Sequence, residues 1–158
     1  MKKINYVFIL VTVFLTATLM YSHNTYAALG GNSASVEADR AHFNATKKSS
    51  VSKVGYSIQE IDAGSVTIRE YVSTTSDLVF GIAWNGFRNP DLGILLGTYA
   101  DEYTKVATQK AQIHGQKNSS SVKTSNITVE QWGHMRNLQG RAYMQSQLPE
   151  GVQSDEIK

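Results

Sequence analysis

The chain has no cysteine among its 158 residues. This absence excludes disulfide bonds, catalysis by a thiol, cysteine-liganded zinc and a lipid attached to an N-terminal cysteine. Such a domain must be stabilised by its hydrophobic core, and a chain of this length can form one. Hydrophobic residues make up 41% of the sequence and charged residues 18%, which is typical of a globular protein and not of a disordered one.

The sequence also lacks a real excess of charge. Its formal charge of +2 comes from fifteen basic and thirteen acidic residues, but Lys2 and Lys3 fall in a segment that we expect to be removed. Without these two lysines, basic and acidic residues are equal in number. Because binding to nucleic acid requires a clustered basic surface, we predict no nucleic-acid partner.

Motifs of established catalytic or cofactor chemistry are absent as well. The sequence has no phosphate-binding glycine loop, no His-Glu-x-x-His and no Gly-x-Ser-x-Gly. His42, His114 and His134 lie far apart in the sequence, so their spacing does not indicate a zinc site. We therefore predict no metal and no cofactor, and we assign no catalytic residue.

The N-terminus has the three parts of a signal peptide. Lys2 and Lys3 precede an apolar run at residues 6–20, and Ala27 ends a Thr-Tyr-Ala site that signal peptidase can read. The alternative is a retained membrane anchor, because the run approaches the roughly 17 residues that a span requires. The polar stretch at 22–24 favours cleavage, so we predict a signal peptide at 1–27 and a single exported domain at 28–158. The mature protein would be periplasmic or extracellular, with no stable membrane anchor.

The centre of the domain is a strand at residues 78–84 that is apolar on both faces, as is usual for a strand in the middle of a sheet. Phe80 is expected to share one side of it with Ile82 and Trp84. Alternating apolar and polar residues predict two half-buried strands before it, at 54–59 and 66–72. The turns between them are short, so the three strands form an antiparallel meander.

Helical signals flank this meander. Asn89 as N-cap and Pro90 at the first helical position predict a long helix over 90–114 that packs an apolar stripe on the sheet. A neighbouring stripe of small residues is expected to lie buried against another backbone; it consists of Gly93, Gly97, Ala100 and Thr104. A short helix is expected over 33–45, capped by Ser33 or Ser35, with a polar linker at 46–52 and a polar loop at 116–125.

Two further strands, at 127–132 and 141–145, form a C-terminal hairpin with a turn at 137–140. An extended tail follows, in which Ile157 can anchor the chain. The predicted fold is therefore α+β: an antiparallel sheet of about five strands, made of the meander and the hairpin. The long helix packs on one face of the sheet and the short helix precedes it.

The hairpin carries the one group of residues that could form a site. A turn at 137–140 would place Arg136 opposite Arg141 and His134 opposite Tyr143, all on one face. Two arginines that face each other repel unless an anion or a carboxylate lies between them.

Three interpretations of this group stay open. A neighbouring acid, such as Glu70 or Glu130, could neutralise the arginines in a purely structural arrangement. The four residues could instead bind a small anionic ligand or the carboxylate of a partner. Catalysis with His134 as acid or base is the third interpretation.

Several segments together resemble a family of small secreted bacterial proteins known as a domain of unknown function, DUF2844. The matching residues run in order through most of the mature chain: Ala28-Leu-Gly-Gly31, Arg69-Glu-Tyr-Val72, Val79-Phe80, Ala83-Trp84, Pro90-Asp-Leu92, Leu95-Leu-Gly-Thr-Tyr99, Gly133-His-Met-Arg136, Gly140-Arg-Ala-Tyr143 and Leu148-Pro-Glu-Gly-Val152. Phe87 stands where the family pattern leads us to expect proline, which concerns a turn and not a site. The resemblance implies a secreted or periplasmic bacterial protein and implies no activity.

These features leave three classes of function. The first is a non-enzymatic exported protein that binds an envelope partner or a small anionic ligand. The second is a small hydrolase-like enzyme centred on His134, which would need an acid and a nucleophile beside it. The third is a structural subunit of the envelope, which would show a large exposed apolar patch or an unprotected sheet edge.

Overall fold

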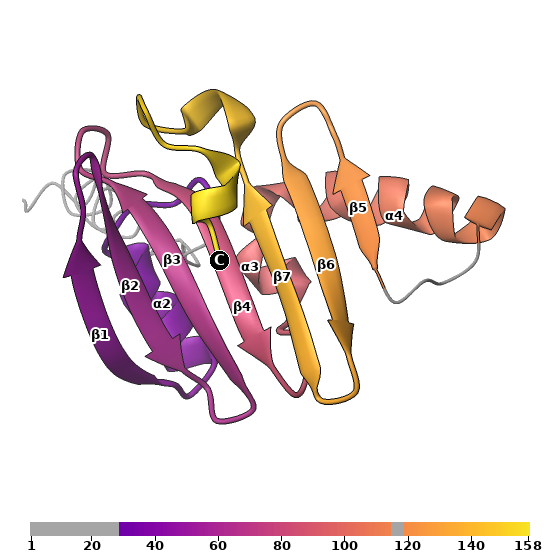
Figure 1. The fold of residues 1–158 in the computed structure, drawn as a ribbon, viewed down its shortest axis with the longest axis horizontal. Helices are drawn as coiled ribbons and strands as arrows, with labels where there is room; N and C mark the ends of the chain where they lie inside the picture. Colours follow the sequence, from indigo (N-terminus) through magenta and orange to yellow (C-terminus); the bar gives the residue numbers. More distant parts are fainter. Residues whose placement is uncertain (1–28, 115–118) are drawn as a thin grey trace, which may run out of the picture.

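A computed structural model describes residues 29–114 and 119–158. These residues form an antiparallel sheet of seven strands in the order β1-β2-β3-β4-β7-β6-β5, with helices on one face and the C-terminal segment on the other (Figure 1). In chain order the elements are α2 (Ser35–His42), β1 (Thr46–Ser52), β2 (Tyr56–Asp62), β3 (Val66–Ser73), β4 (Val79–Gly86), α3 (Leu92–Leu95), η2 (Gly97–Tyr99), α4 (Ala100–His114), β5 (Ser120–Lys123), β6 (Thr128–His134), β7 (Asn137–Tyr143), η3 (Gln145–Gln147) and η4 (Ser154–Glu156). The predicted α+β class is confirmed, with seven strands in place of about five. The predicted signal peptide lies outside the described residues.

The middle of the sheet follows the sequence pattern closely. β2, β3 and β4 pair in succession as the predicted meander, and β4 is the central strand. The prediction that Phe80 shares a side with Ile82 and Trp84 is wrong, because the pairing of β3 with β4 is irregular between Tyr71 and Val72. A bulge at this point reverses the alternation, so Phe80 joins the apolar cluster on the opposite face.

The strands that the sequence did not indicate lie at the two edges of the sheet. β1 occupies the predicted linker at 46–52, and β5 occupies part of the predicted loop at 116–125. No side chain of β1 is buried, and in β5 only Val122 is, so neither strand has the alternation of a half-buried strand. Backbone pairing holds β1 on β2, together with an exposed ion pair between Lys48 and Glu60. Its lysines and its bulge between Lys47 and Ser49 are features that protect an edge strand from pairing with other chains.

The helix predicted over 90–114 is divided into α3, η2 and α4. Gly97 adopts a φ of 51°, which breaks the helix and favours glycine because an added side chain would clash with the backbone. The N-cap is Asp91 and not Asn89, since Oδ1 of Asp91 accepts a hydrogen bond from the N–H of Gly93 at 2.8 Å. The predicted burial of the small-residue stripe is wrong for Gly93 and Thr104, which are exposed, whereas Ala100 is partly buried against the core.

The apolar stripe of the same segment does pack on the sheet, as predicted. Leu95 and Leu96 are buried against the helix-covered face, in a cluster that includes Ile68 and Trp84 of the central strands. The predicted short helix is confirmed as α2. Its N-cap is Ala34, and not Ser33 or Ser35 as predicted.

The opposite face of the sheet carries a smaller core of mostly aromatic residues. Tyr56, Tyr71, Phe80 and Tyr143 meet there, and the C-terminal segment covers them by inserting Ile157. Ile157 is fully buried, which confirms its predicted role as an anchor. It occupies the space over Gly81, where a Cβ would come within 2.8 Å of Cδ1 of Ile157.

Candidate functional site: an open groove on the β6–β7 hairpin

The hairpin of β6 and β7 turns at Met135 and Arg136, directly before the turn predicted at 137–140. His134 pairs with Asn137, and the φ angles of Met135 and Arg136 are 22° and 64°, the left-handed region that a two-residue hairpin turn needs. The predicted register is therefore wrong, and Arg136 does not face Arg141. The tight loop closes before Asn137, so the residues of the predicted turn belong to β7.

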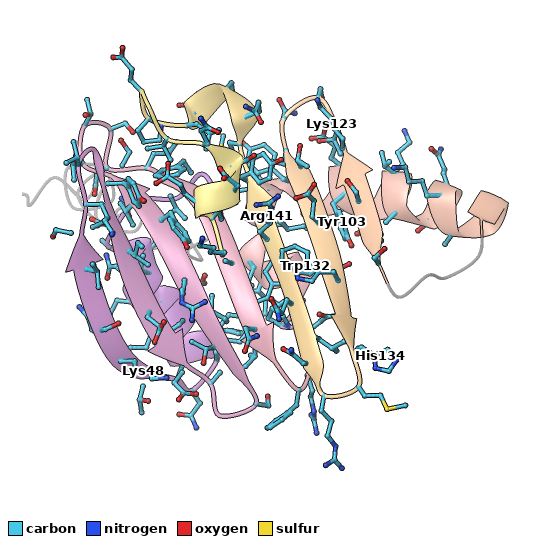
Figure 2. All side chains as sticks on the ribbon, in the orientation of Figure 1. Lys48, Tyr103, Lys123, Trp132, His134 and Arg141 are labelled. Carbon is cyan, nitrogen blue, oxygen red and sulfur yellow. The ribbon has the colours of Figure 1, made fainter. Side chains whose placement is uncertain are left out.

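The four candidate residues consequently divide into two places. His134 and Arg136 are exposed at the tip of the hairpin. Arg141 lies opposite Glu130, and Tyr143 opposite Thr128, both further along the strands. Figure 2 shows His134 at the end of β6, well away from Arg141. The geometry thus unites Arg141 with Tyr143 and separates both from His134 and Arg136.

Arg141 is fixed by contacts on several sides. Its Nε donates to Oε2 of Glu130 at 2.6 Å, and its Nη1 donates to the backbone oxygen of Ser154 at 2.7 Å. Its guanidinium carbon also lies 5.8 Å from the ring centroids of both Trp132 and Tyr143, within the range of a cation–π contact. Of the two acids considered as partners, Glu130 is therefore the one that pairs with Arg141.

An open groove of about 570 Å³ lies beside this arginine. Its lining comprises Ser119, Ser120, Ser121, Glu130, Gln131, Trp132, Gln139, Arg141, Asp155 and Lys158. Two cations and two carboxylates balance each other in this list, and the other lining residues are hydroxyls, amides and an indole. The indole Nε1 of Trp132 donates to Oε1 of Gln139 at 3.2 Å, so its ring is held in a defined orientation. The groove therefore offers a preoriented polar surface with an aromatic ring and side-chain charges that balance.

The C-terminal tail is what closes one side of the groove. The hydroxyl of Tyr71 donates to the backbone oxygen of Lys158 at 2.8 Å and accepts from its backbone N–H at 3.0 Å. The hydroxyl of Tyr56 donates to Oε2 of Glu156 at 3.1 Å. Burial raises the pKa of both tyrosines, so they remain protonated donors near neutral pH. These bonds, with the anchor Ile157, hold the tail on the sheet.

A family model described as "Protein of unknown function (DUF2844)" matches residues 25–157. The chain belongs to this family. Searches of curated proteins and of solved structures found no match. Family membership thus confirms the resemblance and assigns no activity, so the function of this DUF2844 chain must be argued from its geometry.

Two further observations concern the described residues of the DUF2844 chain. Within residues 29–114 and 119–158, no three His, Asp or Glu side chains come together as a metal site would require. In the same part of the chain, no helix is long and apolar enough to cross a membrane.

A second polar feature of the DUF2844 chain is buried on the helix-covered face. Glu70 of β3 and Asp39 of α2 are both fully buried. Neither carboxylate oxygen of Glu70 has a hydrogen-bond partner among the described residues. Burial, and secondly the negative charge of Asp39, raise the pKa of Glu70 well above its ordinary value. Glu70 therefore does not neutralise an arginine, contrary to one interpretation of the sequence.

The sequence contains two signals for this acid pair. Glu70 stands at a core-facing position of an alternating strand, between Ile68 and Val72. Asp39 lies three residues after Val36 on the stripe of α2 that faces the sheet. The groove gives no comparable signal, because its tail residues, Asp155 and Lys158, reach it only through the fold of the C-terminal segment.

Proposed function

We propose that this DUF2844 protein is a non-enzymatic binding protein that acts outside the cytoplasm and holds a small polar ligand in the groove of β6 and β7. The observation that carries the proposal is the fixed arrangement of Arg141, Trp132 and Glu130 at an open groove. Side chains that are oriented before a ligand arrives lose little conformational freedom on binding. Export is supported by the N-terminal sequence pattern alone.

The chemistry of the groove favours a neutral, hydroxyl-rich ligand such as an oligosaccharide. Its lining combines an aromatic ring with amides, hydroxyls and paired charges, which can both donate to and accept from ligand hydroxyl groups. An anionic ligand, the alternative from the sequence, would have to compete with Glu130 for Arg141. Arg136 could not assist it, because that residue lies at the far tip of the hairpin.

The enzyme hypothesis has less geometric support. His134 is exposed at the tip of the hairpin, away from Arg141 and from the groove (Figure 2). The buried acids Glu70 and Asp39 are closed to a substrate, since both are fully buried. A structural subunit is also weakly supported, because the exposed edge strand β1 carries the lysines and the bulge of a protected edge.

The two tryptophans give a direct test by nuclear magnetic resonance. Trp132 lies in the groove, whereas Trp84 is buried on the other face with its indole Nε1 donating to Asn89, so Trp84 is an internal control. Titration with a trimer of N-acetylglucosamine should shift the indole N–H resonance of Trp132 and leave that of Trp84 in place. Trp132→Ala should abolish binding, and Trp132→Phe should retain part of it.

The outcomes separate the alternatives. A shift of Trp132 with citrate but not with the trimer would replace the hydroxyl-rich ligand by an anion. No change at Trp132 with either compound, or equal shifts at both tryptophans, would contradict binding in the groove.

A further inference from the structure

Two large apolar side chains protrude at one end of the sheet. Phe87, directly after β4, is 65% exposed, and Met135, in the β6–β7 turn, is 85% exposed. Each is followed at once by an exposed arginine, Arg88 in the first case and Arg136 in the second. Both loops therefore present the same combination of side chains, an apolar residue followed by an arginine.

The two loops are neighbours in space. β4 pairs with β7 so that Gly86 lies opposite Leu138, and Nδ2 of Asn85 donates to Oδ1 of Asn137 at 3.1 Å. Phe87 therefore leaves the sheet at the end where the turn joins β6 to β7, and Figure 1 shows both connections there. We call Phe87, Arg88, Met135 and Arg136 the tip.

The charges around the tip are positive on balance. Arg88 and Arg136 make no hydrogen bond or ion pair with any described residue. Other charged groups toward this end include Lys47, Lys48, Asp62 and Asp91, with His134 beside the turn, and the ion pair of Arg40 with Glu37 lies near Lys47. Lys48 lies 3.7 Å from Glu60, which is already bonded to Arg69. The two aspartates accept hydrogen bonds from the backbone N–H groups of Gly64 and Gly93.

The residues of the β6–β7 turn are unfavourable for its backbone conformation. Two-residue hairpin turns with left-handed φ angles favour Asn-Gly, since most other residues are strained there. Here Met135 and Arg136 take those positions with φ angles of 22° and 64°. The presence of Met135 and Arg136 in the turn is explained if their side chains contact another molecule.

We propose that the tip is a docking surface for an anionic lipid bilayer. The tip is made of two protruding loops that combine apolar side chains with unpaired cations, which complements a soft surface of negative charge. Phe87 and Met135 would enter the boundary between headgroups and acyl chains, as apolar side chains of interfacial proteins do. Arg88 and Arg136 would stay at the level of the negatively charged headgroups.

The absence of cysteine makes a site-specific test simple. Met135→Cys in the full chain would carry an environment-sensitive fluorophore at the tip. The matched control is Val54→Cys, because Val54 is 96% exposed in the β1–β2 turn at the opposite end of the sheet. With vesicles of phosphatidylglycerol and phosphatidylcholine, the label at position 135 should shift to the blue and the label at 54 should not. Inorganic phosphate without lipid should cause no shift.

Charge variants then test the role of the arginines. Arg88→Gln and Arg136→Gln should each weaken the partitioning of the labelled tip by about five-fold, as expected for one basic residue near an anionic surface. Lys123→Gln, an exposed cation at the other end of the sheet, should change it little (Figure 2).

Three results would overturn the proposal. Absence of a blue shift at position 135 would show that the tip does not enter the bilayer. Equal shifts at positions 135 and 54 would mean attachment without this orientation, for example through the apolar N-terminal run. A shift produced by added unlabelled protein in the absence of vesicles would identify a second copy of the chain as the occupant.

Discussion

Glu70→Gln should remove a pH dependence of stability that the wild-type protein shows near neutral pH. The pKa of Glu70 is raised by burial and by Asp39, so the folded protein holds this proton more tightly than the unfolded chain, where the reference value is 4.5. A group of this kind favours folding at low pH, and its contribution is lost as the pH rises above that reference value. The wild-type protein should therefore become less stable as the pH increases from about 5 to about 7.5.

The size of the effect has a firm upper limit. While Glu70 stays protonated in the folded state, each pH unit above 4.5 lowers the free energy of unfolding by about 1.4 kcal/mol. Across about 2.5 pH units the loss is at most about 3.5 kcal/mol. Gln is close to Glu in shape and has no proton to lose, so the variant should lack this slope. Its buried amide costs roughly 1–3 kcal/mol at every pH, which shifts the curve without tilting it.

Urea unfolding at several pH values measures this slope. Glu150→Gln is a suitable control, because Glu150 is exposed and has no partner among the described residues. The pKa of Glu102 is lowered to about 2, first by hydrogen bonds from Asn126 and Thr124, so its contribution is lost only in more acid solution. Asp39→Asn removes the second cause of the shift and should flatten the slope in part. If wild type and Glu70→Gln had parallel stability curves between about pH 5 and about pH 7.5, the reasoning would be refuted.

Three further predictions concern the tail, the helix break and export. Ile157→Ala should lower the free energy of unfolding by about 2–5 kcal/mol in urea melts, because it empties a fully buried site over Gly81; an unchanged midpoint would show a tail that is not packed. Gly97→Ala and Gly97→Leu should destabilise to a similar degree, roughly 1–2 kcal/mol, because the left-handed φ of Gly97 is unfavourable for any side chain. A much larger loss for Leu would restore the explanation by tight packing. Mass spectrometry of the protein from its native host should find an N-terminus near Ala28, whereas an intact Met1 in the membrane fraction would identify an anchor.

The sequence predicts best the parts of the fold in which buried and exposed residues alternate. The meander, the central position of β4 and the anchor Ile157 all depend on apolar side chains that must leave water. The edge strand β1 could not be predicted in this way, because backbone hydrogen bonds hold it and none of its side chains is buried. The break at Gly97 was also missed, since helical periodicity continues across it and glycine alone does not specify a left-handed φ.

The misplaced site shows a different limit, which concerns register. Alternation along β6 and β7 indicates which face a residue occupies, and it places Glu130 and Trp132 on the face of Arg141. It does not specify which residues of the two strands lie opposite each other, since that depends on where the chain turns. Asn137 to Gly140 has the composition of a turn, whereas Met135 and Arg136 do not, so composition pointed to the wrong loop. Moving the turn to Met135 exchanges an arginine–arginine pair for the Arg141–Glu130 ion pair and sends the other arginine to the tip. One misassigned turn therefore accounts both for the site that was expected and for the two features, groove and tip, that occur in its place.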